Sequence, residues 1–124
     1  MTVAILQARM SSTRLPGKVM KPLLGRPMID RQLERLRRCG TLDRILIATS
    51  TDVSDDALAA HLSAGGLDVF RGSLTDVLDR YLGAARAFGA TGRLVRLTAD
   101  CPLTDPAVID DCVRLHAELG ADYV

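Results

Sequence analysis

Four apolar segments of strand length alternate with four amphipathic segments of helix length, and this alternation restricts the folds open to the chain. The expected strands are residues 2–7, 44–50, 67–70 and 93–97, and the expected helices are residues 26–40, 55–63, 73–88 and 105–119. Strands separated by single helices are typical of right-handed βαβ units. The pattern predicts an α/β fold, a three-layer sandwich with a mainly parallel sheet and helices on both faces.

The ends of these segments carry their own signals. Residues 73–88 form the clearest helical pattern, and Ser73 with Asp76 resembles a capping box in which Asp replaces Glu. Residues 121–124 read as the start of a fifth strand. No repeat or internal boundary interrupts the pattern, so we expect one domain over residues 1–124.

Composition excludes several classes of function. The chain has two Tyr, two Phe and no Trp, so it lacks the aromatic platform of single-stranded nucleic-acid binders. The net charge is +1, yet the first 29 residues hold five basic side chains and no acidic one. Charge concentrated in one segment indicates a local anion site, and we expect no nucleic-acid partner.

The cysteines and the apolar runs point to a cellular compartment. Cys39, Cys101 and Cys112 are odd in number and show no Cys-x-x-Cys spacing, which argues against a disulfide framework or a zinc knuckle. No apolar run reaches membrane-spanning length, and the first strand leaves no room for a signal peptide. We therefore expect a cytoplasmic protein with no membrane partner.

A basic loop follows the first expected strand, and it is the strongest functional signal in the chain. Between residues 8 and 18 it contains three cations (Arg9, Arg14 and Lys18), three hydroxyl side chains and a Pro-Gly turn. Ligands of parallel sheets bind outside the carboxyl ends of strands, so the loop predicts a site for a nucleoside triphosphate. The glycine spacing of Walker A and of the dinucleotide fingerprint is absent. The simpler alternative is an ordinary solvated loop.

Three further features lie at the same expected edge of the sheet. Asp100 follows the fourth strand and is expected to hold Mg²⁺ beside a triphosphate; capping before Pro102 is its alternative. Cys101 next to it could be a nucleophile, but a small buried thiol fits an unpaired cysteine better. The turn of Arg71, Gly72 and Ser73 either contacts a base or ribose, or is only a turn before a helix.

Four motifs together resemble the cytidylyltransferase family that activates acidic sugars, in particular the branch named for spore coat polysaccharide biosynthesis protein F. The motifs are Gln7-Ala-Arg-Met-Ser-Ser-Thr-Arg-Leu-Pro-Gly-Lys18, Ala48-Thr-Ser-Thr-Asp52, Val69-Phe-Arg-Gly-Ser73 with Asp76-Val-Leu-Asp-Arg-Tyr81, and Leu97-Thr-Ala-Asp-Cys-Pro-Leu103. They occur in the family's order and extend over nearly the whole chain.

The resemblance implies a Rossmann-like nucleotide-diphospho-sugar transferase fold and the reaction CTP + sugar → CMP-sugar + pyrophosphate, in the biosynthesis of surface polysaccharides. It assigns the triphosphate to Ala8, Arg9, Ser11, Arg14 and Lys18, the metal to Asp100, and the cytosine region to Arg71, Gly72 and Ser73. Arg14, Lys18 and Asp100 would be the catalytic residues. The implied partners are CTP, Mg²⁺ and a sugar or sugar acid.

The chain departs from the family in length. Family members are longer, and this chain corresponds to their N-terminal half, without the second metal aspartate, much of the sugar pocket and the arm that usually forms a homodimer. An alternative is therefore a truncated, non-catalytic module for nucleotide binding or assembly. The open edge of such a half-sheet would favour self-association.

Overall fold

A four-stranded parallel sheet forms the centre of the computed structural model, which describes residues 1–124. Its strands are β1 (Thr2–Gln7), β4 (Arg44–Ser50), β5 (Asp68–Gly72) and β6 (Arg93–Thr98). They lie in the order β5-β4-β1-β6, and every neighbouring pair is parallel. The α/β class and the parallel sheet expected from the sequence are confirmed.

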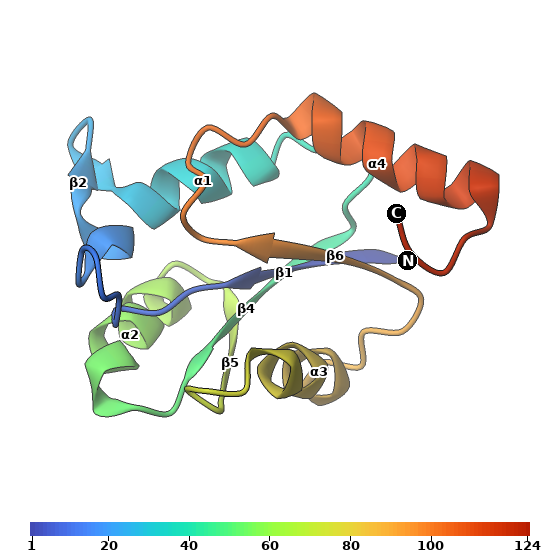
Figure 1. The fold of residues 1–124 in the computed structure, drawn as a ribbon. Coiled ribbons are helices and arrows are strands. Elements are labelled where there is room, and N and C mark those ends of the chain that lie inside the picture. Colours follow the sequence, from blue (N-terminus) through green and yellow to red (C-terminus); the bar gives the residue numbers. More distant parts are fainter.

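Helices cover both faces of this sheet. They are α1 (Met28–Leu36), α2 (Asp56–Ala64), α3 (Val77–Ala87) and α4 (Pro106–Leu119). In Figure 1, α1 and α4 lie above the sheet and α3 lies below it. The three-layer arrangement is therefore also confirmed. None of these helices combines the length and the apolar character that a membrane crossing requires.

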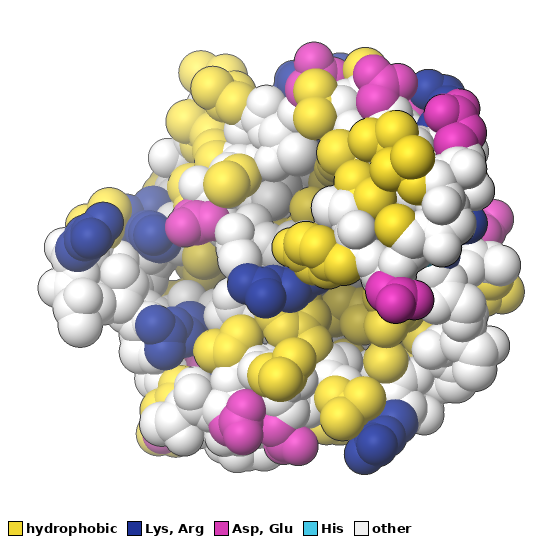
Figure 2. All heavy atoms as spheres, turned by 45° about the vertical axis from the view of Figure 1, so that its right-hand side comes forward, with side chains coloured by type: hydrophobic (Ala, Val, Ile, Leu, Met, Phe, Trp, Pro, Cys, Tyr) yellow, Lys and Arg dark blue, Asp and Glu magenta, His cyan; other side chains and the backbone are white.

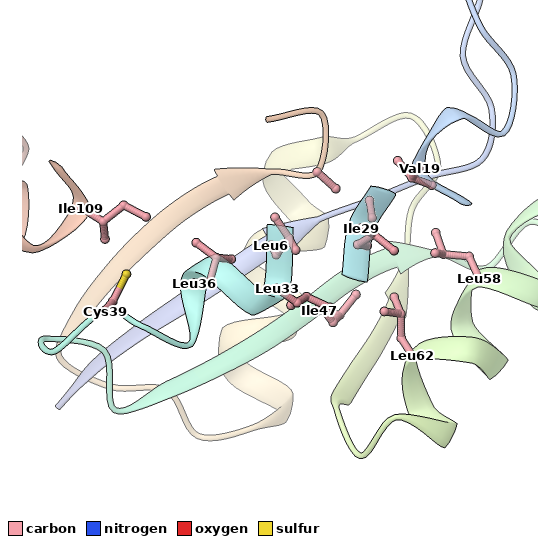
Figure 3. Packing of buried hydrophobic residues seen from close by; sticks show 12 residues of the cluster. Leu6, Val19, Ile29, Leu33, Leu36, Cys39, Ile47, Leu58, Leu62 and Ile109 are labelled. Carbon is pink, nitrogen blue, oxygen red and sulfur yellow. The ribbon is translucent and has the colours of Figure 1, made fainter. Parts of the chain in front are cut away.

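Two hydrophobic clusters hold the layers together, one on each face of the sheet. The larger cluster joins α1, α2 and α4 to the side chains of Leu6 and Ile47, and Figure 3 shows its side chains along this face of the sheet, from Ile109 of α4 to Leu58 and Leu62 of α2. The smaller cluster joins α3 to the opposite face of β1 and β4. Residues on opposite faces of β1 pack into the two different cores. This is why residues 3–6 are all apolar and do not alternate between apolar and polar.

The register of β1 aligns the ends of three strands. Gln7 lies beside Ala48 of β4 on one side and beside Thr98 of β6 on the other. The chain leaves β1 toward β4 and β5 and then returns, after α3, to β6 on the opposite side of β1. The chain therefore leaves the neighbouring strands β1 and β6 in opposite directions. The space between the loops that follow two such strands is where α/β sheets bind ligands.

The start of α3 differs from the expectation. The helix begins at Val77 with Asp76 as its N-cap, and the Asp76 carboxylate accepts the N–H of Asp79. The Ser73 hydroxyl instead accepts the N–H of Asp76 and closes a separate turn before the helix. Each of the two side chains accepts the N–H three residues ahead, and the helix starts after the second of them.

The expected fifth strand is absent, and that expectation was wrong. Residues 121–124 lie outside every strand. Asp122, Tyr123 and Val124 instead line a groove together with residues of β6 and α4, without pairing with a strand.

The outer edge of β6 has no partner strand, and apolar surface lies on both sides of it. One groove, beside α3, is lined by Ile5, Leu78, Tyr81, Leu82, Leu94, Val95 and Arg96. A second, beside α4, is lined partly by Ile109, Cys112 and Val113. Leu78, Leu82 and Leu94 are exposed, and Figure 2 shows hydrophobic side chains gathered around hollows on one face. Unpaired edges with apolar flanks favour association.

A small hairpin of β2 (Pro22–Leu23) and β3 (Arg26–Pro27) precedes α1. Its two turn residues, Leu24 and Gly25, have φ of 52° and 81°. Two-residue hairpins of this kind need positive φ at both positions and favour Asn-Gly. Leucine is therefore strained at the first position.

We expect Leu24→Asn to stabilise the chain by about 1 kcal/mol, because Asn tolerates the left-handed region that costs leucine about 1–2 kcal/mol. Thermal unfolding followed by circular dichroism should show a midpoint a few degrees higher. Gly25→Ala is the matched control and should lower the midpoint. A lower midpoint for Leu24→Asn would contradict the strain argument.

We also expect the chain to self-associate at high concentration through the edge of β6. Leu94→Lys should shift sedimentation toward the monomer, because a charged side chain on an edge strand opposes pairing. Val53→Lys changes an exposed apolar residue outside both grooves and should leave the distribution as it was. A monomer at every concentration for the unmodified chain would refute the expectation.

Candidate functional site

A hollow opens where the loops after β1 and β6 meet. It is lined by Gln7, Ala8, Arg9, Ser11, Ser12, Lys18, Val19, Val77, Thr98, Ala99 and Asp100. The floor is formed by Ala8 and Ala99, both buried, whose N–H groups continue the sheet by donating to Ala48 and Gln7. The hollow brings together the basic loop of residues 8–18 and the carboxylate of Asp100, which lie far apart in the sequence.

Hydrogen bonds fix the basic loop near both of its ends. The N–H of Met10 donates to the Asp55 carboxylate at 2.6 Å, and the N–H of Gly17 donates to the Met10 carbonyl at 2.7 Å. Gly17 has φ of 72°, a conformation that favours glycine. The next residue, Lys18, begins a short 3₁₀ turn (Lys18–Met20) whose Val19 is buried in the larger core.

The cations predicted from the sequence occupy different positions. Arg9 and Lys18 line the hollow together with the hydroxyl of Ser11. Arg14 is exposed and lies outside the lining, on the part of the loop that leads to Gly17. Two of the three cations therefore lie at the hollow, and Arg14 lies outside it.

Asp100 is the carboxylate of the hollow, and its surroundings favour the ionised form. The Thr98 hydroxyl donates to it at 2.8 Å, and Lys18 Nζ lies 3.9 Å from its other oxygen. The Thr98 hydrogen bond is the main reason that the pKa of Asp100 lies below its usual value, with smaller help from Cys101 and Lys18. The hollow thus holds cations and one stable anion.

The residues of the hollow fit a magnesium ion only in combination with a ligand. No cluster of three or more His, Cys, Asp or Glu side chains suited to a metal occurs in the chain. Mg²⁺, however, is commonly bound through one or two carboxylates, water and substrate phosphates. A single ionised Asp100 would meet that requirement only if a phosphate were bound in the hollow.

Arg71 and Gly72 are the last two residues of β5, so the expectation of a turn at residues 71–73 was wrong for both of them. These residues and Ser73 lie at the same edge of the sheet but outside the hollow. The Arg71 guanidinium donates to the carbonyls of Ser50 and Asp52 and to the Asp56 carboxylate, at 2.7–2.9 Å. Gly72 is packed tightly, since an added Cβ would lie 2.7 Å from the Phe70 ring. In this arrangement the Arg71 side chain ties β5 to the end of β4.

Cys101 is exposed, and the expectation of a buried thiol was wrong. It lies on the loop after β6, with its Sγ 3.5 Å from an Asp100 oxygen. Partial burial and the neighbouring carboxylate raise the pKa of this thiol. A raised pKa lowers the thiolate fraction, so the position does not favour a nucleophile.

Helix α1 holds the loop after β6, and the sequence patterns gave no sign of this. The fully buried side chain of Gln32 donates to the Thr98 carbonyl at 2.9 Å, and Arg35 donates to the Thr104 carbonyl at 2.8 Å. A polar residue on the apolar face of the expected helix was the available signal. The role of Gln32 could not be assigned from the sequence, because it depends on the position of the end of β6 relative to α1.

Two buried charges behind the basic loop were also missed. Asp55 is fully buried and accepts the Ser50 hydroxyl as well as the Met10 N–H. Arg80 is fully buried on α3 and donates to the carbonyls of Ser73 and Leu74, while its Nε and Nη2 lack partners. Burial lowers the pKa of Arg80, and Arg9 lowers it further.

Comparison with known proteins identifies a family and several relatives. The cytidylyltransferase family model matches residues 3–124. The chain is 42% identical to the spore coat polysaccharide biosynthesis protein SpsF of Bacillus subtilis, over 96% of this chain and 51% of that protein. It is 31% identical to a 3-deoxy-manno-octulosonate cytidylyltransferase of Geobacter metallireducens, over 96% of this chain and 44% of the relative.

Solved structures agree with this result. A cytidylyltransferase from Leptospira borgpetersenii superposes with a TM-score of 0.85 at 36% identity, over 94% of this chain and 49% of that one. A CMP:2-keto-3-deoxy-manno-octonic acid synthetase complexed with CTP has the same fold, with a TM-score of 0.79 at 22% identity, over 97% and 48% of the two chains. The present chain spans about half the length of these relatives.

We expect Thr98→Val to raise the pKa of Asp100 toward its ordinary value, because it removes the main donor to the carboxylate. An NMR pH titration of the Asp100 carboxyl carbon measures this directly. Thr104→Val is the matched control, since the Thr104 hydroxyl donates to the Cys101 carbonyl and leaves Asp100 untouched.

The same variant should change acid stability in a defined direction. A lowered pKa in the folded state contributes stability above the ordinary carboxyl pKa, and that contribution is lost as pH falls through the lowered value. Thr98→Val should therefore lose part of its stability at neutral pH but little below the folded pKa. An unchanged titration in Thr98→Val would show that another group lowers the pKa of Asp100.

Proposed function

Because the chain belongs to the cytidylyltransferase family, we propose that it is the nucleotide-binding part of an enzyme that transfers CMP from CTP to a sugar or sugar acid. The observation that carries the proposal is the hollow between the loops after β1 and β6, which joins the basic loop to Asp100. The names of its relatives support a role in surface polysaccharide biosynthesis, and we place that role in the cytoplasm.

The triphosphate would lie along the basic loop. The Ser11 hydroxyl and the side chains of Arg9, Arg14 and Lys18 would face its oxygens. Ala8 would contribute the floor of the site, because its N–H already donates to the Ala48 carbonyl. Arg can donate two parallel hydrogen bonds to a phosphate, whereas Lys supplies a point charge. The exposed position of Arg14 lets its side chain turn onto a ligand that already contacts the rest of the loop.

In the proposed reaction, a hydroxyl oxygen of the sugar attacks the α-phosphorus of CTP. The bond from that phosphorus to the bridging oxygen breaks, pyrophosphate leaves, and the hydroxyl proton passes to solvent or a base. Arg14 and Lys18 would stabilise the charge that develops on the phosphates and the leaving group. The protein would thus act by positioning and electrostatics, as in other phosphoryl and nucleotidyl transfers.

Asp100 would hold Mg²⁺ together with phosphate oxygens and water. A bound Mg²⁺ supplies charge neutralisation for the phosphates and a fixed direction for the leaving group. Lys18, which lies 3.9 Å from Asp100 in this structure, would then be free to contact phosphate. Losing one such charge-stabilising group typically lowers a rate by about 10²- to 10³-fold.

The cytosine would lie near residues 71–73, at the end of β5. The Arg71 side chain is engaged with Ser50, Asp52 and Asp56, and the carbonyls of Gly72 and Ser73 accept hydrogen bonds from Thr51 and Arg80. The N–H and hydroxyl groups of Ser73 are therefore the better candidates for reading the base. Val77, which lines the hollow just after this turn, offers an apolar contact to the ring.

A second function is favoured by the charges of the hollow. Asp100 is the one carboxylate that lines it. A module that binds nucleotide without turning it over, and that assembles through the edge of β6 into a homodimer or with another polypeptide, is therefore the alternative. Formation of CMP-sugar by this chain would exclude it.

Isothermal titration of CTP with Mg²⁺ into the chain tests the proposal. Arg14→Ala should weaken CTP binding by about 10- to 100-fold, the range for hydrogen bonds to charged groups. Arg114→Ala removes the same charge from the far side of α4, where Arg114 pairs with Asp111, and should leave CTP affinity unchanged.

ATP and UTP serve as ligand controls and should bind more weakly than CTP if the turn before α3 reads the base. If Arg14→Ala and Arg114→Ala weakened CTP binding equally, the effect would come from the net charge of the protein and not from a contact of Arg14 with CTP. An absence of CTP binding to the unmodified chain would overturn the proposal for this length of polypeptide.

A further inference from the structure

A buried carboxylate behind the basic loop has no role in the site as described so far. Asp55 ends the short 3₁₀ turn (Val53–Asp55) after β4, and none of its surface is exposed. It lies outside the lining of the hollow, so a ligand there would not touch it. Its hydrogen bonds nevertheless lead directly to the loop.

The first of these bonds crosses between distant segments. Asp55 Oδ1 accepts the N–H of Met10 at 2.6 Å across 45 positions of sequence, and its other oxygen accepts the hydroxyl of Ser50 at the end of β4. One carboxylate thus joins the carboxyl end of β4 to the loop after β1. A hydrogen bond to an ionised group is about twice as strong as a neutral one.

A second hydrogen bond connects Met10 to the far end of the loop. The Met10 N–H donates to Asp55, and the Met10 carbonyl accepts the N–H of Gly17. Gly17 immediately precedes Lys18, whose Nζ faces Asp100. Asp55 is therefore connected, through Met10, both to the start of the loop and to the residue before Lys18.

We propose that Asp55 is a positioning residue for the anion site: through Met10 and Gly17 it holds the loop of residues 8–18 in its ligand-binding shape. Arg80, a buried cation, supports this role. Burial lowers the pKa of Arg80, and the negative charge of Asp55 opposes that lowering. The part of the inference that concerns affinity rests on the proposed function, whereas the part that concerns loop order does not.

Amide hydrogen exchange measured by NMR tests the loop directly. In Asp55→Ala the N–H groups of Met10 and Gly17 should exchange about 10- to 100-fold faster, as expected when a hydrogen bond to a charged acceptor is lost. Amides in the centre of β1 should keep their rates. Asp52→Ala is the matched control, because Asp52 caps Ser54 in the same turn and does not contact the loop.

Titration of CTP into the same variants gives the second measurement. Asp55→Ala should weaken CTP binding by about 10-fold or more while Asp52→Ala binds normally. Asp55→Asn keeps one acceptor oxygen but not the charge, so its exchange rates and affinity should fall between those of the unmodified chain and Asp55→Ala. It also provides the test should Asp55→Ala fail to fold.

The outcomes separate the two proposals. Faster exchange at Met10 and Gly17 in a folded Asp55 variant, with Asp52→Ala unchanged, supports the positioning role even if CTP does not bind. Unchanged exchange at both amides in a folded Asp55→Ala or Asp55→Asn overturns it, even if CTP binds tightly. Absence of CTP binding in every variant, including the unmodified chain, counts against the proposed function alone.

Discussion

The parallel pairing of β1 with a strand on each side is the constraint on which the rest of this structure depends. Because β4 and β6 both pair with β1 in register at Gln7, the loops that follow β1 and β6 must begin side by side. The chain moves away from β1 in one direction and returns on the other, so nothing fills the space between these loops. The position of the hollow therefore follows from the order of the strands and does not depend on any particular side chain.

Side chains from outside the hollow then determine its shape. Gln32 and Arg35 of α1 hold the loop after β6 by its carbonyls, and Asp55 holds the loop after β1 by an amide. Each contact joins segments far apart in the sequence. The groups available for a ligand, by contrast, lie within the two loops themselves. Binding chemistry is therefore local in sequence, whereas the support for it is distributed over the whole fold.

This division explains how far the sequence could predict the structure. Strand and helix periodicity predicted the sheet and its layers, and the run of cations without carboxylates predicted the loop that lines the hollow with Asp100. The start of α3 was misplaced because Ser73 and Asp76 are both good caps, and local sequence does not show which is used. Asp55 and Gln32 could not be assigned, since an acidic residue in a turn and a glutamine in a helix gain their roles only from partners 45 and 66 positions away.

The way the basic loop is fastened has a consequence for the entropy of binding. Met10 and Gly17 are fixed by hydrogen bonds, and between them two longer bonds restrain the backbone, both at 3.3 Å: the Leu15 N–H donates to the Ser12 hydroxyl, and the Leu15 carbonyl accepts the Lys18 N–H. Ordering a residue costs about 1–2 kcal/mol of conformational entropy. A ligand bound by this loop would find its frame already in place and would have to immobilise mainly the short span that carries Arg14. The entropic cost of binding at the proposed site would then fall on that span and not on the ends of the loop.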